Sequence, residues 1–271
     1  MNYKIALTIA GSDSCGGAGI QADIKTMSAL GVYAASAITA VTAQNTCGVD
    51  AVEGISPSVV AGQIDAVFAD MRPDAVKLGM LFSEEIVNAV ADRLSAHHAT
   101  NIVVDPVMVS TSGCKLIADG AIEAVKRRLF PLADIVTPNR QEAELIADIR
   151  LTDSESVDRA ARVMLDMGCR YVLIKGGHFD DNHMTDRLYG ADGSAVSIAG
   201  ARISTANTHG TGCTLSSAIA SFLALGCSVT EAVAEAKQYV QAAIEAGAQV
   251  AIGKGHGPLN HFHDPKKLKI V

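Results

Sequence analysis

The sequence is poor in several features that mark particular classes of protein. Tryptophan is absent, and aromatic residues make up only 4% of the 271 residues. The formal net charge is −7, so the chain lacks the basic surplus that favours binding to nucleic acid or to a membrane surface. No apolar run is long enough to span a bilayer. We therefore expect no nucleic-acid partner and no membrane partner.

Disulfide and zinc-binding patterns are also missing. The six cysteines are spread along the chain and form no CxxC pair, so the sequence indicates neither a disulfide framework nor a zinc site. The apolar start, Ile5–Ala10, is too short for a signal peptide. This cysteine usage is typical of the reducing cytoplasm, where we expect the protein to reside.

What the chain does contain is a regular alternation of strand-like and helix-like segments, with 49% hydrophobic residues to build a core. Most strand-like runs are continuously apolar, as expected for strands covered on both faces. We expect strands at Ile5–Ala10, Ala34–Val41, Ala75–Leu78, Ile102–Val104, Ile135–Thr137 and Tyr171–Ile174, and a hairpin of Arg187–Tyr189 with Ala195–Ile198. We expect helices at Gly19–Leu30, Pro57–Ala69, Glu84–His97, Gly120–Leu129, Gln141–Ala147, Ser154–Met167 and Val229–Ala248, the last opened by a capping box of Ser228 and Glu231.

This alternation predicts an α/β protein whose mostly parallel sheet lies between two layers of helices. The chain shows no linker, internal repeat or low-complexity run, so we expect one domain over residues 1–271. In such sheets, ligands bind at the loops that follow the carboxyl ends of the strands.

The segment Asn207–Cys213 is the strongest single indication of a site. Apolar residues at helical spacing follow it, and Gly226 stands where a left-handed helix end favours glycine. Gly210 and Gly212 therefore lie at a helix start, where unpaired backbone N–H groups and the helix dipole favour an oxyanion such as phosphate. The same field predicts a lowered pKa for the Cys213 thiol.

The glycine-rich loop Gly11–Gly19 has two interpretations. Gly17, Gly19 and Ala22 match the GxGxxA pattern of dinucleotide-binding folds. The turn is long, however, and the next strand does not end in the acidic residue that a ribose requires, so we disfavour that interpretation. An ordinary glycine-rich turn does not explain Asp23, which lies just inside the following helix.

Later strand ends carry further polar side chains. Thr42–Thr46 by itself fits an ordinary polar turn. Asp105 directly follows a buried strand and could bind Mg²⁺, activate a hydroxyl or cap a turn. Asn139 and Glu142 fit ordinary helix capping, but together with Asp105 they suggest a metal–phosphate site. Lys175, at another strand end, could supply a cation that faces phosphate.

His209 introduces an alternative chemistry. It lies four residues before Cys213, and a Cys–His pair would suit a thiol hydrolase or acyltransferase. We find no second histidine or carboxylate in the sequence that is placed to orient His209, which counts against this alternative. The remaining paired or tail histidines fit surface or packing roles better than metal binding: His97, His98, His256, His261 and His263.

In combination, these motifs resemble the hydroxymethylpyrimidine/phosphomethylpyrimidine kinases of thiamin biosynthesis, a branch of the ribokinase superfamily close to the pyridoxal kinases. The resemblance runs from about Ile5 to His261, and the order of its motifs is specific although each motif alone is not. It is carried by AGSDSCGGAGIQAD (Ala10–Asp23), TAQNT (Thr42–Thr46), KLGML (Lys77–Leu81), DPVMV (Asp105–Val109), TPNRQEAE (Thr137–Glu144), IKGGH (Ile174–His178), NTHGTGCTLSSAIA (Asn207–Ala220) and GHGPLNH (Gly255–His261).

The resemblance implies a three-layer α/β/α ribokinase-like fold, a homodimer, and an ATP- and Mg²⁺-dependent kinase. Such a kinase phosphorylates 4-amino-5-hydroxymethyl-2-methylpyrimidine and then the monophosphate. The implied pyrimidine contacts are Gly11, Ala18, Asp23, Gln44, Met80, Val107 and Cys213. The implied ATP contacts are Asp105, Asn139, Glu142, Lys175, Thr208, Thr211, Gly212, Lys237 and Val240. Asp105 and Glu142, partly through water, are the implied Mg²⁺ ligands, and Gly210, Thr211, Gly212 and Cys213 are the implied catalytic residues.

Cys213 stands where most of the wider superfamily carries aspartate. We hypothesise that its thiolate accepts the hydroxyl proton in the first transfer, whereas the second transfer, onto an anionic phosphate, needs little base. In the flap Ser110–Gly113, many relatives carry lysine in place of Thr111, and Ser110 replaces a second cysteine of some pyridoxal kinases, which favours the pyrimidine. A pyridoxal kinase, a thiol hydrolase and a catalytically silent pyrimidine-binding protein are the alternatives.

Overall fold

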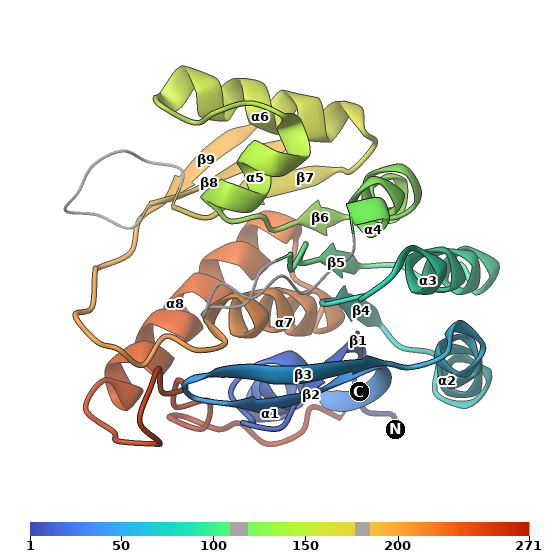
Figure 1. Ribbon diagram of the computed structural model, residues 1–271, viewed down its shortest axis with the longest axis horizontal. Coiled ribbons are helices and arrows are strands. Elements are labelled where there is room, and N and C mark those ends of the chain that lie inside the picture. Colours follow the sequence, from blue (N-terminus) through green and yellow to red (C-terminus); the bar gives the residue numbers. More distant parts are fainter. Residues whose placement is uncertain (109–118, 177–184, 271) are drawn as a thin grey trace.

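The computed structural model describes residues 1–108, 119–176 and 185–270. These residues form a nine-stranded sheet in the order β3-β2-β1-β4-β5-β6-β7-β8-β9, with helices on both faces (Figure 1). The strands are β1 (Ile5–Asp13), β2 (Tyr33–Asn45), β3 (Gly48–Gly54), β4 (Ala75–Leu78), β5 (Ile102–Val104), β6 (Ile135–Val136), β7 (Tyr171–Ile174), β8 (Asp186–Gly190) and β9 (Ala195–Ile198). The α-helices are α1 (Gly19–Ala29), α2 (Pro57–Asp70), α3 (Glu84–Ala96), α4 (Asp119–Ala124), α5 (Arg140–Ala147), α6 (Ser154–Asp166), α7 (Thr211–Ala224) and α8 (Val229–Gly247).

The centre of the sheet is parallel and its edges are antiparallel. Parallel pairing runs from β2 through β1, β4, β5 and β6 to β7. β3 at one edge, and β8 and β9 at the other, pair antiparallel with their neighbours. The predicted mostly parallel sheet and the hairpin near its end are therefore confirmed.

Two hydrophobic cores lie on the two faces of the sheet, and β1 contributes to both. Leu7 and Ile9 pack into the core formed with α2 to α6, whereas Ala6, on the opposite face, packs into the core formed with α1, α7 and α8. A strand covered on both faces needs apolar residues at successive positions, which explains the continuous apolar runs. The three-layer α/β/α arrangement is confirmed.

The polar turn expected at residues 42–46 was wrong. Residues up to Asn45 continue β2, and Gln44 pairs with Val49 in an antiparallel hairpin with β3. This part of the sheet is half-exposed, so polar residues are tolerated and the apolar pattern that would reveal a strand is weak.

Several helix boundaries follow the expected capping chemistry. The capping box of Ser228 and Glu231 at the start of α8 is present, and Gly226, just past α7, has a φ of +96°. The helix expected over residues 120–129 is instead divided, because α4 ends at Ala124 and Val125–Leu129 form a π-helical turn. The flap at residues 110–113 lies outside the described residues. Among the described helices, none combines the length and apolar character that a bilayer span requires.

Candidate active site

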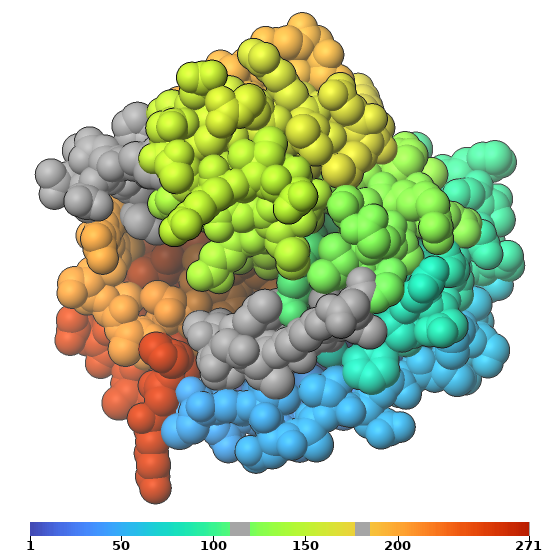
Figure 2. Space-filling model, turned by 45° about the horizontal axis from the view of Figure 1, so that its top comes forward, coloured from blue at the N-terminus to red at the C-terminus, as the bar shows by residue number. Residues whose placement is uncertain are grey.

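A pocket of about 800 Å³ lies where the parallel strands end and α7 begins. Its wall includes residues that end or follow β1, β2, β4, β5, β6 and β7, the place where ligands bind in sheets of this type. The surface is hollowed between the yellow-green region of α5 and α6 and the orange segment before α7 (Figure 2).

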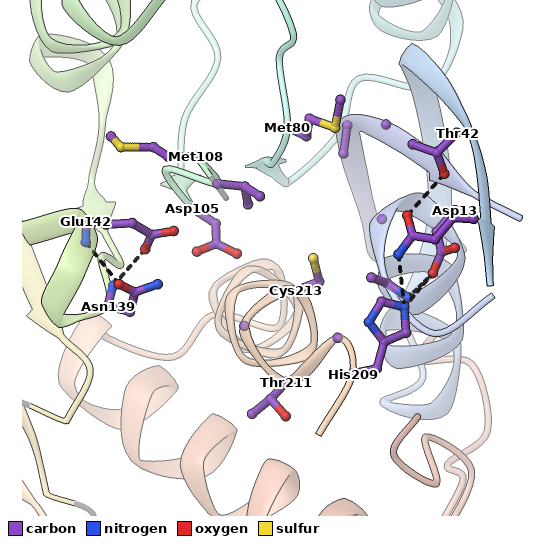
Figure 3. Close-up of a pocket in the computed structure, with 18 of the residues that line it drawn as sticks. Asp13, Thr42, Met80, Asp105, Met108, Asn139, Glu142, His209, Thr211 and Cys213 are labelled. Atoms are coloured by element: carbon purple, nitrogen blue, oxygen red, sulfur yellow. Dashed lines mark hydrogen bonds and ion pairs between the residues drawn. The ribbon is translucent and has the colours of Figure 1, made fainter. Parts of the chain in front are cut away.

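Most of the residues implied by the resemblance meet in this pocket. Figure 3 shows Cys213 in the middle, with Met80 on one side and with Asp105 and Glu142 on the other. Their contacts with ligands stay predictions, but the fold brings their side chains together. The predicted residues that line the pocket are Gly11, Ala18, Gln44, Met80, Asp105, Val107, Asn139, Glu142, Lys175, Thr208, Gly210, Thr211, Gly212 and Cys213.

Asp23 is an exception among the predicted acceptor contacts, because it does not line the pocket. Its side chain is fully buried and does not line the pocket. Lys77 Nζ lies 2.9 and 2.8 Å from its two carboxylate oxygens, and the hydroxyls of Thr8 and Ser217 also donate to them. The carboxylate is therefore occupied by protein donors, as a buried charge requires.

Lys237 and Val240, expected beside adenine, also lie outside this pocket. Lys237 Nζ donates to Asp186 at 2.6 Å, and Val240 is buried in the core that α8 shares with α7. The tertiary structure thus directs both side chains of α8 into contacts within the protein.

The start of α7 is built on close approach between two loops. Gly210, the residue before the helix, has a φ of +83°, and a Cβ there would collide with the carbonyl of Gly17. Only glycine meets both conditions without strain. The anion loop predicted at residues 207–213 therefore packs directly against the glycine-rich loop after β1.

The expectation of a lowered pKa for Cys213 was wrong. Burial raises the pKa of the thiol to about 11; Lys77 opposes this effect, while Asp23 and Asp105 add to it. Loss of solvent around the thiol and the negative charges of Asp23 and Asp105 both disfavour the thiolate. In the ligand-free protein the thiol is therefore protonated near neutral pH.

Two carboxylates and one lysine form the opposite side of the pocket. Asp105 Oδ1 accepts from Lys175 Nζ at 3.0 Å and from the Thr137 hydroxyl at 3.2 Å, and Oδ2 accepts from the Ser216 hydroxyl at 3.1 Å. Burial acts to raise the pKa of Asp105, but Lys175 and Lys77 outweigh it and hold the pKa below its ordinary value. Asp105 is therefore an ionised side chain at the edge of the pocket.

Glu142 combines a capping role with a position in the pocket. It forms a capping box with Asn139: Glu142 Oε2 accepts from the Asn139 N–H at 2.8 Å, and the Asn139 side chain accepts from the Glu142 N–H at 2.9 Å. Burial and the nearby Asp105 raise the pKa of Glu142 to about 7, although Lys175 opposes them. A hard divalent cation such as Mg²⁺ would offset the repulsion between the Asp105 and Glu142 carboxylates.

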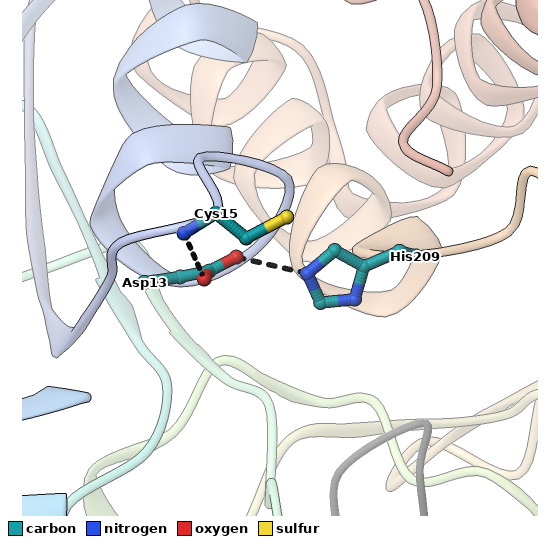
Figure 4. A group of neighbouring side chains, drawn as sticks. All are labelled: Asp13, Cys15 and His209. Atoms are coloured by element: carbon teal, nitrogen blue, oxygen red, sulfur yellow. Dashed lines mark hydrogen bonds and ion pairs between the residues drawn. The ribbon is translucent and has the colours of Figure 1, made fainter. Parts of the chain in front are cut away.

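Asp13 is a site residue that the sequence analysis missed. Its Oδ2 lies 2.8 Å from His209 Nε2, so a carboxylate does orient this histidine, contrary to the sequence-based expectation. Backbone N–H groups of Cys15, Gly17 and Ala18 also donate to Asp13. The possible metal-ligating atoms of Asp13, Cys15 and His209 lie within 4.8 Å of one another (Figure 4). Because the Asp13 carboxylate already accepts four hydrogen bonds, we interpret this cluster as the anchor of the glycine-rich loop.

Lys77 also borders the pocket without having been predicted, although its side chain is fully buried. Burial acts to lower the pKa of Lys77, but Asp23 outweighs it and raises the pKa. A lysine inside the apolar run Ala75–Leu78 was the available signal, since a buried strand tolerates a cation only with a buried partner.

Comparison with known proteins gives a consistent result. The chain matches the phosphomethylpyrimidine kinase family over residues 13–260. A hydroxymethylpyrimidine/phosphomethylpyrimidine kinase of Rhizobium meliloti is 51% identical over 260 residues, 96% of this chain and 97% of that protein. A thiamine biosynthesis bifunctional protein of Geobacter sulfurreducens is 51% identical over 257 residues. These residues are 94% of this chain and 52% of that protein, so the chain spans about half the length of this relative.

Among solved structures, a pyridoxal kinase from Staphylococcus aureus in complex with AMP-PCP and pyridoxal has a TM-score of 0.87 and 34% identity. The similarity covers 97% of this chain and 94% of that one, so the ribokinase-like arrangement is shared over almost the whole length. The extent of the family match, the identity to the Rhizobium enzyme and the shared fold together show that this chain belongs to the phosphomethylpyrimidine kinase family.

Proposed function

We propose that this protein transfers a phosphoryl group from ATP to the hydroxymethyl oxygen of 4-amino-5-hydroxymethyl-2-methylpyrimidine, and then a second one to the resulting monophosphate. One observation carries the assignment within the molecule: the start of α7 and Cys213 line the same pocket as Gln44, Met80, Asp105 and Glu142. The named activity of the Rhizobium meliloti relative, which is 51% identical, supports the same reaction.

The acceptor side of the pocket suits a flat, amine-bearing ring. Gln44 presents an amide that can both donate to and accept from a pyrimidine edge. Met80 and Val107 offer apolar contact to the ring. This combination of one amide with apolar walls orients a small heterocycle with few polar contacts.

The donor side suits the phosphates of ATP. Backbone N–H groups at residues 210–213 lie at a helix start, where they stabilise charge that grows on the transferred phosphoryl group. Lys175 adds a positive charge on the same side. Asp105 and Glu142 would hold Mg²⁺, which when bound neutralises phosphate charge.

In the first transfer, the hydroxymethyl oxygen forms a bond to the γ-phosphorus while the bond from that phosphorus to the β,γ-bridging oxygen breaks, releasing ADP. The hydroxyl proton passes to the thiolate form of Cys213, which faces the middle of the pocket (Figure 3). In the second transfer the attacking oxygen belongs to an anionic phosphate, so proton removal matters less.

The assignment is tested by incubating the protein with ATP, Mg²⁺ and the hydroxymethylpyrimidine, and counting the phosphates added by mass spectrometry. Two phosphates on the pyrimidine are expected, and EDTA should abolish the reaction. Phosphorylation of pyridoxal alone, or no transfer, would reject the assignment.

Pyridoxal is the second acceptor to test, because the pyridoxal kinase from Staphylococcus aureus shares the fold at a TM-score of 0.87. A parallel reaction with pyridoxal, compared by kcat/KM, ranks the two acceptors.

The thiol hydrolase alternative predicts turnover of a thioester or ester without ATP, and the same protein preparation can be assayed for this activity.

A further inference from the structure

A glutamine side chain discriminates between ligands only when its amide oxygen, an acceptor, and its amide nitrogen, a donor, are held in one orientation. The oxygen and nitrogen of the Gln44 side chain have nearly the same shape, so a half turn exchanges an acceptor for a donor. In the structure this amide touches two neighbours. Gln44 Nε2 lies 3.4 Å from His209 Nε2, and Gln44 Oε1 lies 3.2 Å from the Thr42 hydroxyl (Figure 3).

Asp13 determines which ring nitrogen of His209 carries a hydrogen. Burial acts to raise the pKa of Asp13, but hydrogen bonds from His209, Ala18 and Cys15 outweigh it and keep the pKa below its ordinary value. An ionised carboxylate can only accept, so the His209 Nε2 that lies 2.8 Å from Asp13 Oδ2 carries a hydrogen. This holds whether the ring is neutral or cationic.

The Gln44 end that faces His209 must therefore be an acceptor. An amide N–H₂ opposite an imidazole N–H would place two donors together, whereas the amide oxygen can share the imidazole hydrogen with Asp13. At the other end, the Thr42 hydroxyl lies 3.0 Å from the Ser12 carbonyl oxygen and donates its hydrogen there, so it can accept from the amide N–H₂. All these groups are satisfied together only when the amide is turned by half a turn, so that the Gln44 oxygen lies toward His209 and the nitrogen toward Thr42.

The geometry points to His209, held by Asp13, as a positioning residue that determines acceptor specificity by fixing the orientation of the Gln44 amide. The fixed amide keeps one oxygen lone pair and one N–H for a ligand, always on the same sides. The oxygen can accept from an exocyclic amine while the N–H donates to the adjacent ring nitrogen, so the site favours heterocycles that carry both groups over rings that lack the amine. The inference rests on the proposed function, because it takes an aminopyrimidine as the acceptor.

Direct binding measurements without ATP test this role. Calorimetry would give Kd for the hydroxymethylpyrimidine and for pyridoxal with the wild type, His209→Phe and His209→Gln. We expect His209→Phe to weaken pyrimidine binding at least tenfold while changing pyridoxal binding less than threefold. His209→Gln, which keeps an N–H within similar reach, should restore most of the discrimination.

A separate variant and a control keep the test decisive. Thr42→Val removes the partner at the other end of the amide and should also lower the preference for the pyrimidine, even if His209→Phe fails to fold. Kd for the ATP analogue AMP-PCP should stay within threefold in each folded variant. An unchanged preference, or equal losses for pyrimidine and nucleotide, overturns the inference. A wild type that binds no pyrimidine overturns the proposed function instead.

Discussion

At the scale of single residues, Cys213 shows how burial changes a chemical role. A thiol with a pKa of about 11 is ionised in roughly one molecule in ten thousand at pH 7. If this small fraction accepts the hydroxyl proton, the first transfer must depend steeply on pH. The second transfer, onto an anionic phosphate, must depend on it less.

We therefore expect the rate of the first transfer to rise about tenfold per pH unit between pH 7 and pH 9. Cys213→Ala should remove this slope and slow the first transfer more than the second. Cys213→Asp, which restores a carboxylate, should give a flat profile. Rapid-quench assays of each transfer provide the measurement, and equal losses in both transfers would contradict the role of Cys213 as a base.

The buried pair of Lys77 and Asp23 should dominate the effect of mutations at these positions on stability. Lys77→Met leaves the Asp23 carboxylate buried without its cation, and we expect a loss of about 3–5 kcal/mol in the free energy of unfolding. The double variant Lys77→Met/Asp23→Asn should lose clearly less, because it removes both charges. Urea unfolding measures these differences.

An ion pair with one exposed partner provides the matched control for that measurement. Lys126→Met removes the partner of Glu123, which is 69% exposed, and should change stability by less than about 0.5 kcal/mol. Equal effects of Lys77→Met and Lys126→Met would show that the buried pair is not needed for stability.

At the scale of elements, two glycines at the start of α7 have different requirements. Gly210 has a φ of +83° and no space for a Cβ, whereas a Cβ on Gly212 would meet its nearest neighbour, Lys175 Nζ, at an ordinary contact distance of 3.5 Å. Gly210→Ala should cost at least about 1–3 kcal/mol from backbone strain alone. Gly212→Ala should leave the melting temperature nearly unchanged. Thermal unfolding measures the melting temperatures of the two variants. Similar values would argue against a requirement for the positive φ of Gly210.

The elements differ in how well local sequence reveals them. Helices α3 and α5 to α8 are predicted by apolar spacing and capping residues, because these patterns act within a few positions along the chain. The hairpin of β2 and β3 was missed beyond Val41 because its residues are half-exposed and its stability comes from pairing between strands. The π-helical turn after α4 was also not predicted.

At the scale of the whole molecule, the segment after α8 returns to α7 and ties the chain end to the fold. His261 is buried, its Nε2 lies 3.1 Å from the Thr214 hydroxyl, and its carbonyl accepts from the Tyr239 hydroxyl at 2.6 Å. Burial lowers the pKa of His261 to about 4, below the value near 6.5 of an unfolded chain. The unfolded state therefore binds a proton first as the pH falls.

It follows that the neutral His261 makes its full contribution to the free energy of unfolding above about pH 6.5. This contribution falls by about 3 kcal/mol as the pH drops toward 4. We expect the wild type to lose more stability than His261→Gln between pH 7 and pH 4.5. Urea unfolding at both pH values gives the comparison, in which other acid-sensitive groups cancel. Parallel losses would exclude a buried neutral His261.

The assembly is a further property at this scale. Family precedent leads us to propose a homodimer, which sedimentation velocity should reveal as a species of twice the 28.1 kDa chain mass. A single species of the chain mass at micromolar concentration would contradict it.

The sequence by itself determined the fold class, most of the helices and strands, and the set of motifs that meet in the pocket. It could do so because apolar period and capping are local, and because parallel strands place their carboxyl ends at one edge of the sheet. Gly210, Cys213, Asp105 and Glu142 were predicted on this basis and lie in one pocket.

Only the tertiary structure decided the partners and charges of these groups. It paired Asp13 with His209, 196 positions apart, and withdrew Asp23 from the pocket by pairing it with Lys77. It also raised the pKa of Cys213 where the helix start alone predicted a lower one. Burial and hydrogen bonding depend on neighbours that are distant in sequence, so no local pattern contains them.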